Sequence, residues 1–393
     1  KHDPPVNALT ARIEALAGEL RQAEVQVPST LIFRERKEPR DAFLLLRGQY
    51  DQRGDQVERA TPDALPPMTS DMPLNRLGLA SWLVSPGHPL TSRVAVNRVW
   101  QPLVGAGLAE AREGLGNQGA LPTPPQLLDW LAVEFRESGW DIKALMKTLV
   151  MSSTYRQSSV LSPDMAQSDP ENRYYARGPR FRLDAETMRD QALFLSGELN
   201  PELGGPAVKP PQPAGLWKAV GFSSSNTVEF VADTEPERIN RRSLYVFIKR
   251  TAPPPEMTTF DAPSRESPCM RRERTNTPLQ ALLLMNDPQY VSAAQSLAAR
   301  VMQANLPDAR QRAAHMIQLC TLRTPDDSVV DELLGLYQQQ LDQYSADVGA
   351  AERLIAARLP GRFKTSELDK TELAAWTVVA NLVLNLDEVI MKN

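Results

Sequence analysis

Cysteine and histidine are scarce in this chain, and their scarcity excludes several kinds of site. Its 393 residues include two cysteines, Cys269 and Cys320, and three histidines. Neither a Cys-x-x-Cys-His haem attachment nor a zinc-ligand spacing is present. We therefore expect no metal and no cofactor in this chain, and a haem c would belong to an upstream domain or a partner. Whether the two cysteines form a disulfide stays open, because the sequence does not place them within bridging distance.

Long hydrophobic runs and a basic excess are also missing. No stretch of about 18 apolar residues occurs, so no membrane span is expected. The opening residues lack the apolar core of a signal peptide, and they resemble the middle of a longer polypeptide. A net charge of −4 and a pI near 5.7 argue against a general nucleic-acid binder, and they leave room for a local basic patch. Phosphate loops, dinucleotide fingerprints and nucleophile elbows are absent, so no reaction class is indicated.

Helical periodicity is what the sequence contains over most of its length. Apolar side chains recur every three or four residues in nine segments. These segments are 74–84, 89–105, 124–139, 141–153, 184–197, 277–303, 309–321, 326–345 and 369–390. Gly105 and Gly139 follow two of them, at positions that suit helix C-caps. The sequence predicts a mainly α fold, with one large helical body, long ordered proline-rich loops and minor β structure.

Composition divides the chain into three regions. Residues 1–27 predict a connector helix with an apolar stripe, which either packs against a domain or forms a coiled-coil arm. Residues 28–73 are proline-rich and extended, and residues 74–393 form the helical domain. Two short strands are expected, at 42–47 and 244–250.

Three helix starts share one pattern, a threonine followed by a proline. The pairs are Thr123-Pro124, Thr277-Pro278 and Thr324-Pro325. Threonine suits the N-cap, and proline suits the first helical position because its missing N–H would have no partner there. We interpret the pattern as recurrent capping and not as an internal repeat.

The segment 249–284 is the most informative part of the sequence. Three consecutive prolines, 253–255, prevent a regular strand ladder. A long charged loop of this kind is more often functional than decorative. It supplies one set of ligand-binding candidates, Arg265, Arg271, Arg272, Arg274 and Asn276.

These side chains precede a helix start, and that placement favours an anionic ligand. Exposed N–H groups at a helix N-terminus attract negative charge, and guanidinium groups bind carboxylate, sulfate or phosphate with two hydrogen bonds. An acidic or sulfated oligosaccharide would fit. The alternative is that the arginines pair with carboxylates and hold the loop in place. The carboxylates considered for this role are Asp261, Glu266, Glu273 and Asp287.

The same loop carries weak catalytic candidates. Asp261 and Glu266 could act as an acid–base pair on a glycoside or an alcohol. Such pairs occur in every charged loop, so a purely structural role is the alternative. Cys269 among cations could be a reactive thiol, although no histidine lies near it in the sequence.

A second candidate site lies on one helix face. Arg93, Asn97 and Trp100 recur at helical spacing, followed by Gln101. Amides beside an aromatic ring suit a sugar-binding cleft. Buried structural hydrogen bonding is the alternative.

Several segments carry a resemblance to a known family along most of the chain. They are HPLTSRVAVNRVWQPLVGAGL (88–108), PTPPQLLDWLAVEFRESGWDIKALMKTLVMSSTYRQSS (122–159), DPENRYYARGPRFRLDAETMRDQAL (169–193), RRSLYVFIKRTAPPPEMTTFDAPSRESPCMRRERTNTPLQALLLMNDPQYV (241–291) and ELAAWTVVANLVLNLDEVI (372–390). The chain resembles the planctomycete-type, cytochrome-associated C-terminal domain of unknown function 1553. The family supplies no established catalytic residues that could be transferred to this sequence.

The resemblance implies a setting for the chain. In this family the domain usually follows a companion domain of unknown function, and a c-type cytochrome domain often lies further upstream. The helix near the N-terminus resembles the connector between the two domains. The resemblance also implies an exported protein, in the periplasm or at the cell surface.

Two function classes remain, and whether the protein is an enzyme stays open. The first is a non-catalytic helical assembly or anionic-ligand-binding module of a larger exported, cytochrome-associated protein. The second is a subunit of a carbohydrate-active or redox enzyme that passes electrons to a c-type cytochrome.

Overall fold

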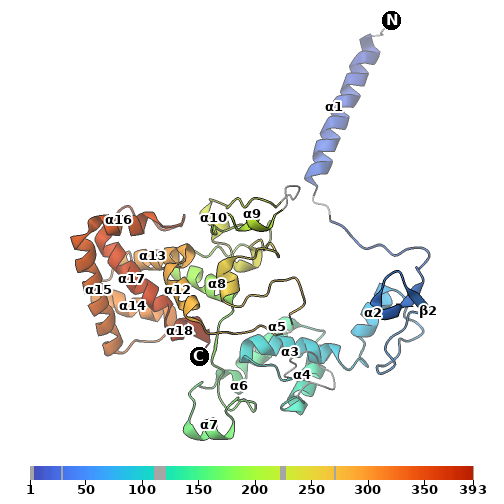
Figure 1. Ribbon diagram of the computed structural model, residues 1–393, viewed down its shortest axis with the longest axis horizontal. Coiled ribbons are helices and arrows are strands. Elements are labelled where there is room, and N and C mark those ends of the chain that lie inside the picture. The colour runs from blue at the N-terminus through green and yellow to red at the C-terminus, as the bar shows by residue number, and fades with distance from the viewer. Residues whose placement is uncertain (1–3, 28–29, 110–120, 222–226, 270, 393) are drawn as a thin grey trace. The chain divides into compact units, whose positions relative to one another are not determined.

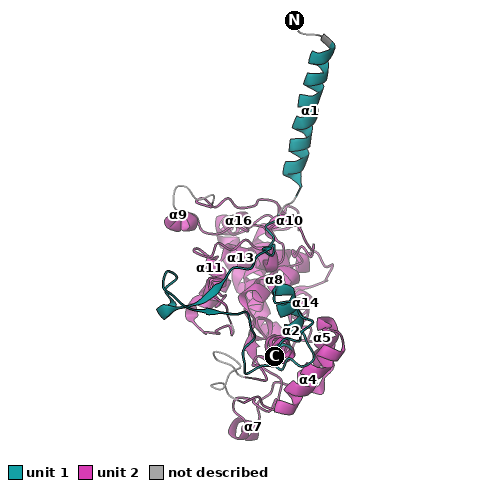
Figure 2. Ribbon diagram, turned by 90° about the vertical axis from the view of Figure 1, so that its right-hand side faces the viewer, with its two compact units in different colours: residues 1–91 teal, residues 92–393 magenta. Residues whose placement is uncertain are grey.

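The computed structural model describes residues 4–27, 30–109, 121–221, 227–269 and 271–392. Over these residues the chain is mainly α, which confirms the predicted fold class (Figure 1). It divides into two compact units, residues 1–91 and residues 92–393 (Figure 2). Among the described residues, no helix is both long enough and apolar enough to cross a membrane.

The first unit contains two helices and one antiparallel hairpin in its described part. They are α1 (Pro4–Gln26), β1 (Ala42–Leu45), β2 (Arg53–Val57) and α2 (Arg76–Leu83), with a 3-10 turn at Leu46–Gly48. The strand predicted at 42–47 is confirmed but ends two residues early, because Arg47 has a left-handed φ of 52°. Trp82 anchors α2: it is buried and donates from its indole nitrogen to the Pro66 carbonyl at 2.7 Å.

The second unit begins with three helices around a small apolar core. They are α3 (Thr91–Val104), α4 (Pro125–Glu137) and α5 (Ile142–Met151). Leu128, Leu131 and Phe135 follow one another at helical spacing on α4, and all three are buried in this core together with Trp100 of α3. Gly105 and Gly139 follow α3 and α4 with φ of 88° and 78°, which confirms their predicted places at the helix ends.

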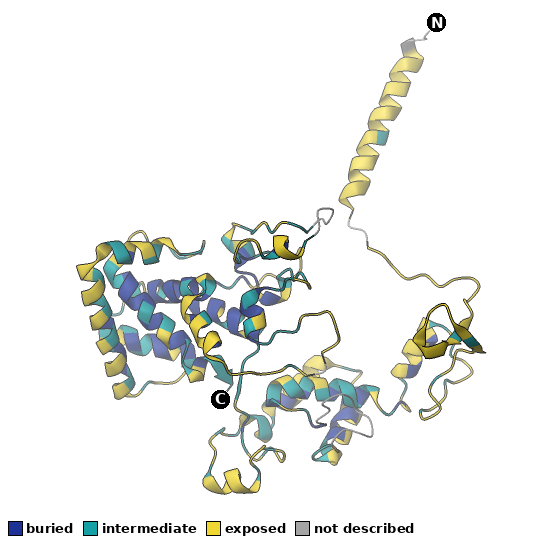
Figure 3. Ribbon diagram, viewed as in Figure 1, coloured by how far each residue is buried: buried dark blue, intermediate teal, exposed yellow. Residues whose placement is uncertain are grey.

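A larger core forms around two helices, α13 (Pro288–Met302) and α17 (Lys370–Leu384). Figure 3 shows the buried residues concentrated on these two elements. Small residues at Ala293, Ala294 and Ala298 let α17 approach α13 closely, and Trp376 is fully buried. The main helices packed around them are α8 (Ala185–Ser196), α12 (Pro278–Asn286), α14 (Ala309–Thr321), α15 (Asp327–Ala346) and α16 (Val348–Ala356).

The remaining elements of the second unit are short. They are α6 (Ser153–Arg156), α7 (Pro163–Ser168), β3 (Phe181–Arg182), α9 (Leu216–Val220), α10 (Pro236–Ile239), a 3-10 turn at Ser243–Tyr245, α11 (Pro255–Thr259), α18 (Asp387–Ile390) and β4 (Met391–Lys392). β3 pairs antiparallel with β4, so Phe181 lies opposite Lys392. This pairing joins two parts of the chain that are far apart in sequence.

The predicted strand at 244–250 is wrong. Within it the structure has a 3-10 turn and single bridges, of which Val246 with Val208 is one. The segment that pairs with it contains Pro206, Pro210 and Pro211. Prolines cannot donate to a ladder, so the pairing does not extend beyond Val208.

The helix predicted over 277–303 is divided. α12 ends at Asn286 and α13 begins at Pro288, because proline cannot continue the hydrogen-bond pattern of the preceding turn. Asp287 caps the new helix by accepting from the Gln289 amide at 2.8 Å. Of the three predicted threonine N-caps, the one at Thr277 is confirmed. Those at Thr123 and Thr324 are wrong, because the N-cap of α4 is Pro124 and that of α15 is Asp326.

Candidate functional site

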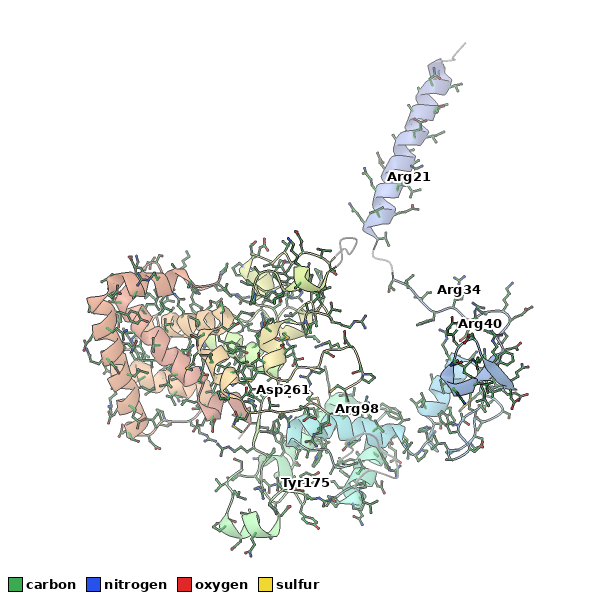
Figure 4. All side chains as sticks on the ribbon, viewed as in Figure 1. Arg21, Arg34, Arg40, Arg98, Tyr175 and Asp261 are labelled. Carbon is green, nitrogen blue, oxygen red and sulfur yellow. The ribbon has the colours of Figure 1, made fainter. Side chains whose placement is uncertain are left out.

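The loop that leads into α12 begins packed and ends exposed. Met257 and Phe260 are buried in the larger core and hold the start of the loop. Asp261, labelled in Figure 4, follows with a left-handed φ of 61°. Its carboxylate accepts from the Thr275 amide at 2.7 Å and from the Thr275 hydroxyl at 2.9 Å. Asp261 therefore closes the loop by joining its two ends. Glu266, the other catalytic candidate, lies exposed on the outer part of the loop.

Two of the predicted ligand-binding arginines contact one carboxylate of α8. Arg272 donates to both oxygens of Glu186, from Nη1 at 2.5 Å and from Nη2 at 3.1 Å. Arg265 reaches the same carboxylate at 3.3 Å. Burial acts to raise the pKa of Glu186, but the hydrogen bond from Arg272, a backbone hydrogen bond and the charges of Arg272 and Arg265 together hold that pKa below its ordinary value. Glu186 thus pairs with both arginines, and the Asp184 carboxylate lies 3.6 Å from Arg272 as well.

Arg274 has a different environment from its neighbours. Its guanidinium lies 4.2 Å from the centre of the Phe181 ring and donates to the Gly105 carbonyl at 3.1 Å. Arg274 also forms a long ion pair, in which its Nη2 lies 3.8 Å from Oδ1 of Asp184. Burial lowers the pKa of Arg274 from its ordinary value. A Cβ added to Gly105 would lie 2.7 Å from the Phe181 ring, so only glycine fits against this stack.

The buried side chain of Gln280 fixes the end of the loop. Its Oε1 accepts from Arg182 at 2.6 Å and from the Thr277 amide at 3.0 Å. Its Nε2 donates to the Thr259 carbonyl at 2.8 Å and to the Thr275 hydroxyl at 3.2 Å. The Asn276 side chain accepts from Arg182 at 3.5 Å. Asn276 is therefore tied to β3.

Two further loop residues predicted from the sequence lie on the surface. Arg271 is exposed, and its positive charge acts to lower the pKa of Arg274. Cys269 is exposed and unbridged, and its thiol lies 3.1 Å from the Arg271 carbonyl oxygen. Cys320 is buried and also unbridged, and burial raises the pKa of its thiol to about 12.

The second predicted cluster is divided among different contacts. Arg93 pairs with Asp129 at 2.7 Å on the surface. Asn97 forms two hydrogen bonds of 3.0 Å with the backbone of Ala109 and holds the chain that follows α3. Trp100 is 3% exposed and packs edge to face against Tyr175, with ring centres 5.1 Å apart.

An open cleft of about 1210 Å³ lies where these two regions meet. The C-terminal end of α3, residues 156–161, part of 170–181, Arg274, Arg323 and the start of α18 line it. Tyr175, labelled in Figure 4, forms part of the lining, and the buried Trp100 ring packs against it. Of the predicted ligand-binding residues, Arg274 is the one that the structure places in the lining.

Basic side chains outnumber acidic ones in the described lining of this cleft. The arginines are Arg156, Arg177, Arg180, Arg274 and Arg323, and the carboxylates are Glu171, Asp387 and Glu388. Arg180 pairs with Asp387 at 2.9 Å. Arg177 donates to the carbonyls of Asp169 and Pro170, which leave its charge unneutralised.

Arg156 and Arg323 are the two cleft arginines that are both exposed and, over the described residues, outside every ion pair. Arg156 ends α6, and the neighbouring Tyr155 ring lies 3.7 Å from the Lys392 ammonium. Lys392 also donates to the Leu103 carbonyl, so it fastens α6 to the end of α3. Burial lowers the pKa of Lys392 to about 8.

Four of the cleft arginines, Arg156, Arg177, Arg180 and Arg323, were not predicted as ligand-binding residues from the sequence. Arg177 and Arg180 stand in the run RGPRFR, and the acidic residues that follow it, Asp184 and Asp190, suggest an ion-pair network. Arg156 and Arg323 stand alone in the sequence, and only the fold brings them to one cleft. Closely spaced arginines beside glycine and proline in RGPRFR are the one local signal that could have indicated the site.

A buried acidic cluster also lies outside the predicted set. Glu256 is 7% exposed, and burial, with the nearby charge of Asp287, raises its pKa to about 6. Arg189 is buried beside them and donates to Gln289 at 2.7 Å. Burial raises the pKa of Asp287 and of Tyr290 as well. Over the residues that the structure describes, no group of three or more acidic, histidine or cysteine side chains could hold a metal ion.

Comparisons with known proteins give the chain its family. A family model described as "PSD1: Protein of unknown function (DUF1553)" matches residues 75–337, about two thirds of the chain. Searches of curated proteins and of solved structures found no match. The matched range includes α3, β3, most of the cleft lining and the arginine loop, which is the segment that leads into α12 and carries Arg265, Arg271, Arg272 and Arg274. This chain belongs to the family of proteins of unknown function DUF1553.

Proposed function

We propose that this chain is a non-catalytic module that binds an anionic ligand in the arginine-lined cleft. The observation that carries the proposal is the pair of exposed cleft arginines, Arg156 and Arg323, which no carboxylate neutralises over the described residues. Cations held on a concave surface without matched anions attract and orient negative groups. Arg274, stacked on Phe181, adds a fixed positive charge to the same wall.

The size and lining of the cleft favour an extended, hydroxyl-rich ligand. At about 1210 Å³ the cleft exceeds the roughly 300–1,000 Å³ of an ordinary small-molecule pocket. Ser158, Ser159 and Asn172 add hydroxyl and amide groups to the lining. Arginine binds sulfate and carboxylate with two parallel hydrogen bonds. An acidic or sulfated oligosaccharide combines all of these requirements.

The setting of the module is proposed from the family resemblance. We place it in a larger exported, cytochrome-associated protein of planctomycete type, in the periplasm or at the cell surface. A c-type haem would be carried by an upstream domain or a partner chain, because Cys269 and Cys320 are not arranged as a haem attachment. The companion domain or partner chain would then be the neighbour of this module.

Calorimetric titration with a sulfated oligosaccharide and a neutral one of equal length tests the proposal. We expect only the sulfated ligand to bind, and its affinity to fall as salt screens the arginines. Arg156→Gln and Arg323→Gln should each weaken binding about tenfold, since each removes a charge-assisted contact. Arg36→Gln, an exposed arginine of the first unit, is the matched control and should leave the affinity unchanged. Equal binding of both oligosaccharides, or unaltered affinity in both cleft variants, contradicts the proposal.

A second candidate function is an enzyme subunit, and the buried Glu256 favours it. A carboxyl group with a pKa of about 6 could donate a proton near neutral pH to a glycoside or to a redox substrate. Such a subunit would act on a carbohydrate or pass electrons to the c-type cytochrome. The two small cavities that reach the adjacent Tyr290 and Gln289 hold about 20 Å³ each, room for a water molecule only. These cavities offer a substrate no route to Glu256, and this supports the binding module over the enzyme.

A turnover assay distinguishes the binding module from the enzyme subunit. The full chain is incubated with the oligosaccharide that binds best, and the products are analysed by mass spectrometry at pH 5 and pH 7. Intact ligand supports the binding module. Cleavage or oxidation that is lost in Glu256→Gln supports the enzyme.

A further inference from the structure

Helix α1 exposes a continuous apolar stripe. Val6, Leu9, Ile13, Leu16 and Leu20 are between 54% and 66% exposed. Apart from the half-buried Ala17, every side chain described on this helix is exposed. Figure 1 shows α1 as one uninterrupted helix. A single helix of this length is only marginally stable in water, so the stripe indicates a missing partner.

The spacing of the stripe identifies the kind of partner. Its residues alternate steps of three and four, which is the a and d pattern of a heptad repeat. Val6, Ile13 and Leu20 occupy a positions, and Leu9, Leu16 and Ala23 occupy d positions. A repeat of seven keeps the apolar seam facing one neighbouring helix along its length. The partner is therefore another helix with the same repeat.

We infer that α1 pairs with α1 of a second copy of this chain in an antiparallel coiled coil. In that orientation Ile13 lies opposite Leu16 of the partner subunit, and Leu9 lies opposite the partner's Leu20. The seam from Val6 to Ala23 is centred within the helix Pro4–Gln26, so the two copies overlap over their whole length. Large isoleucine and leucine side chains thus fill the middle of the seam, and the smaller Val6 and Ala23 meet at the ends.

The charges that flank the seam select the antiparallel orientation. Arg12 and Glu19 occupy g positions, and Glu24 occupies an e position. In an antiparallel pair Arg12 faces the partner's Glu19, and the symmetric contact repeats it. In a parallel pair Glu19 would face the partner's Glu24, and Arg12 would face the uncharged Ala17 of the partner subunit. Two attractive contacts thus replace two repulsive ones.

Sedimentation of the 393-residue chain tests this inference. We expect a concentration-dependent dimer that Leu16→Asp converts to a monomer. Ala11→Asp, on the opposite face of the same helix, is the matched control and should leave the dimer intact. A monomer at every concentration overturns the inference, and so does a dimer that persists in Leu16→Asp.

Charge reversal decides the orientation. In the antiparallel pair, Glu19→Arg places an arginine opposite Arg12. The repulsion between them should raise the dissociation constant of the dimer about tenfold. Adding Arg12→Glu to this variant should restore the original affinity. In a parallel pair, Glu19→Arg would relieve the repulsion with Glu24 and tighten the dimer. A tighter dimer in Glu19→Arg therefore overturns the antiparallel arrangement. This inference is independent of the cleft, whose ligand binding these variants leave unchanged.

Discussion

Arg272 holds Glu186 through both guanidinium nitrogens, across a separation of 86 residues in the sequence. The Glu186 side chain is 18% exposed and that of Arg272 is 33% exposed, so water screens the contact only in part. The pair attaches the exposed part of the arginine loop to the first turn of α8. The loop therefore depends on a helix that lies far from it along the chain.

Arg272→Ala should destabilise the protein by about 1–2 kcal/mol, because the half-buried Glu186 carboxylate loses its main partner. The midpoint of urea unfolding measures the change. Arg265→Ala is the matched control: its side chain is 51% exposed and contacts the same carboxylate at 3.3 Å, so we expect a cost below about 0.5 kcal/mol. Equal effects of the two variants would contradict the unequal roles of the two arginines.

The same pair predicts a dependence on pH. The pKa of Glu186 is lowered in the folded chain, so its contribution to stability is complete above its unfolded pKa. That contribution is lost as the pH falls through the folded value. The stability difference between the wild type and Arg272→Ala should therefore be largest near pH 7 and narrow below about pH 4. A difference that stays constant down to pH 3 would show that the ion pair is not its cause.

Gly105→Ala should destabilise the protein by about 2–4 kcal/mol. The substitution forces a left-handed φ of 88° on alanine and places its Cβ 2.7 Å from the Phe181 ring. Gly139→Ala separates the two effects, because Gly139 has a φ of 78° with nothing within 4 Å of an added Cβ. Its cost should be about 1 kcal/mol. Thermal unfolding of both variants measures the difference, and equal costs would exclude a steric role for Phe181.

Gln280→Ala should cost about 3 kcal/mol, because it removes the hydrogen bonds that the buried Gln280 side chain makes with the Thr277 amide, the Thr259 carbonyl and Arg182. The exposed neighbour Leu279 supplies the control, and Leu279→Ala should cost less than about 0.5 kcal/mol. Denaturant titration compares them. A small loss in Gln280→Ala would mean that water replaces the amide, and that the loop does not rely on it.

Glu256→Gln should stabilise the protein at pH 8 by about 2 kcal/mol. The folded pKa of Glu256 is raised from 4.5 to about 6, so ionisation opposes folding as the pH rises through this window. Below pH 4.5 the carboxyl is protonated in both folded and unfolded chains, and the advantage of glutamine should vanish. Unfolding at pH 4 and pH 8 measures it. Glu266→Gln, on the exposed loop, should change stability at neither pH, and an equal gain there would contradict the burial argument.

Most of the helical framework could be predicted from the sequence, because its causes are local. Apolar spacing located α3, α4 and α5, and glycine located the ends of the first two. The predicted strand at 244–250 failed because β structure depends on the partner segment. That segment is interrupted by prolines at 206, 210 and 211. The sequence of residues 244–250 alone gives no sign of this interruption.

The candidate site was harder to predict, because its partners are distant in sequence. The arginine loop was located, but the carboxylate that holds Arg265 and Arg272 lies in α8 and not among the acidic residues of the loop itself. Arg274 was proposed with the others for an anion site, and it is the member that lines the cleft. Its role depends on Gly105 and Phe181, which lie in two other segments.

The pairing of β3 with β4 has a consequence for how the protein is made. One side of the cleft is built from residues 177–181, and it is fixed by Lys392 and by Asp387, which pairs with Arg180 across 207 residues. A ribosome releases the arginine-containing segment 177–181 long before it releases these partners. At roughly 5–20 residues per second, the segment waits on the order of ten seconds or more. During translation the nascent chain therefore exposes an unfinished basic surface, and the cleft acquires its final form only when α18 and β4 have emerged.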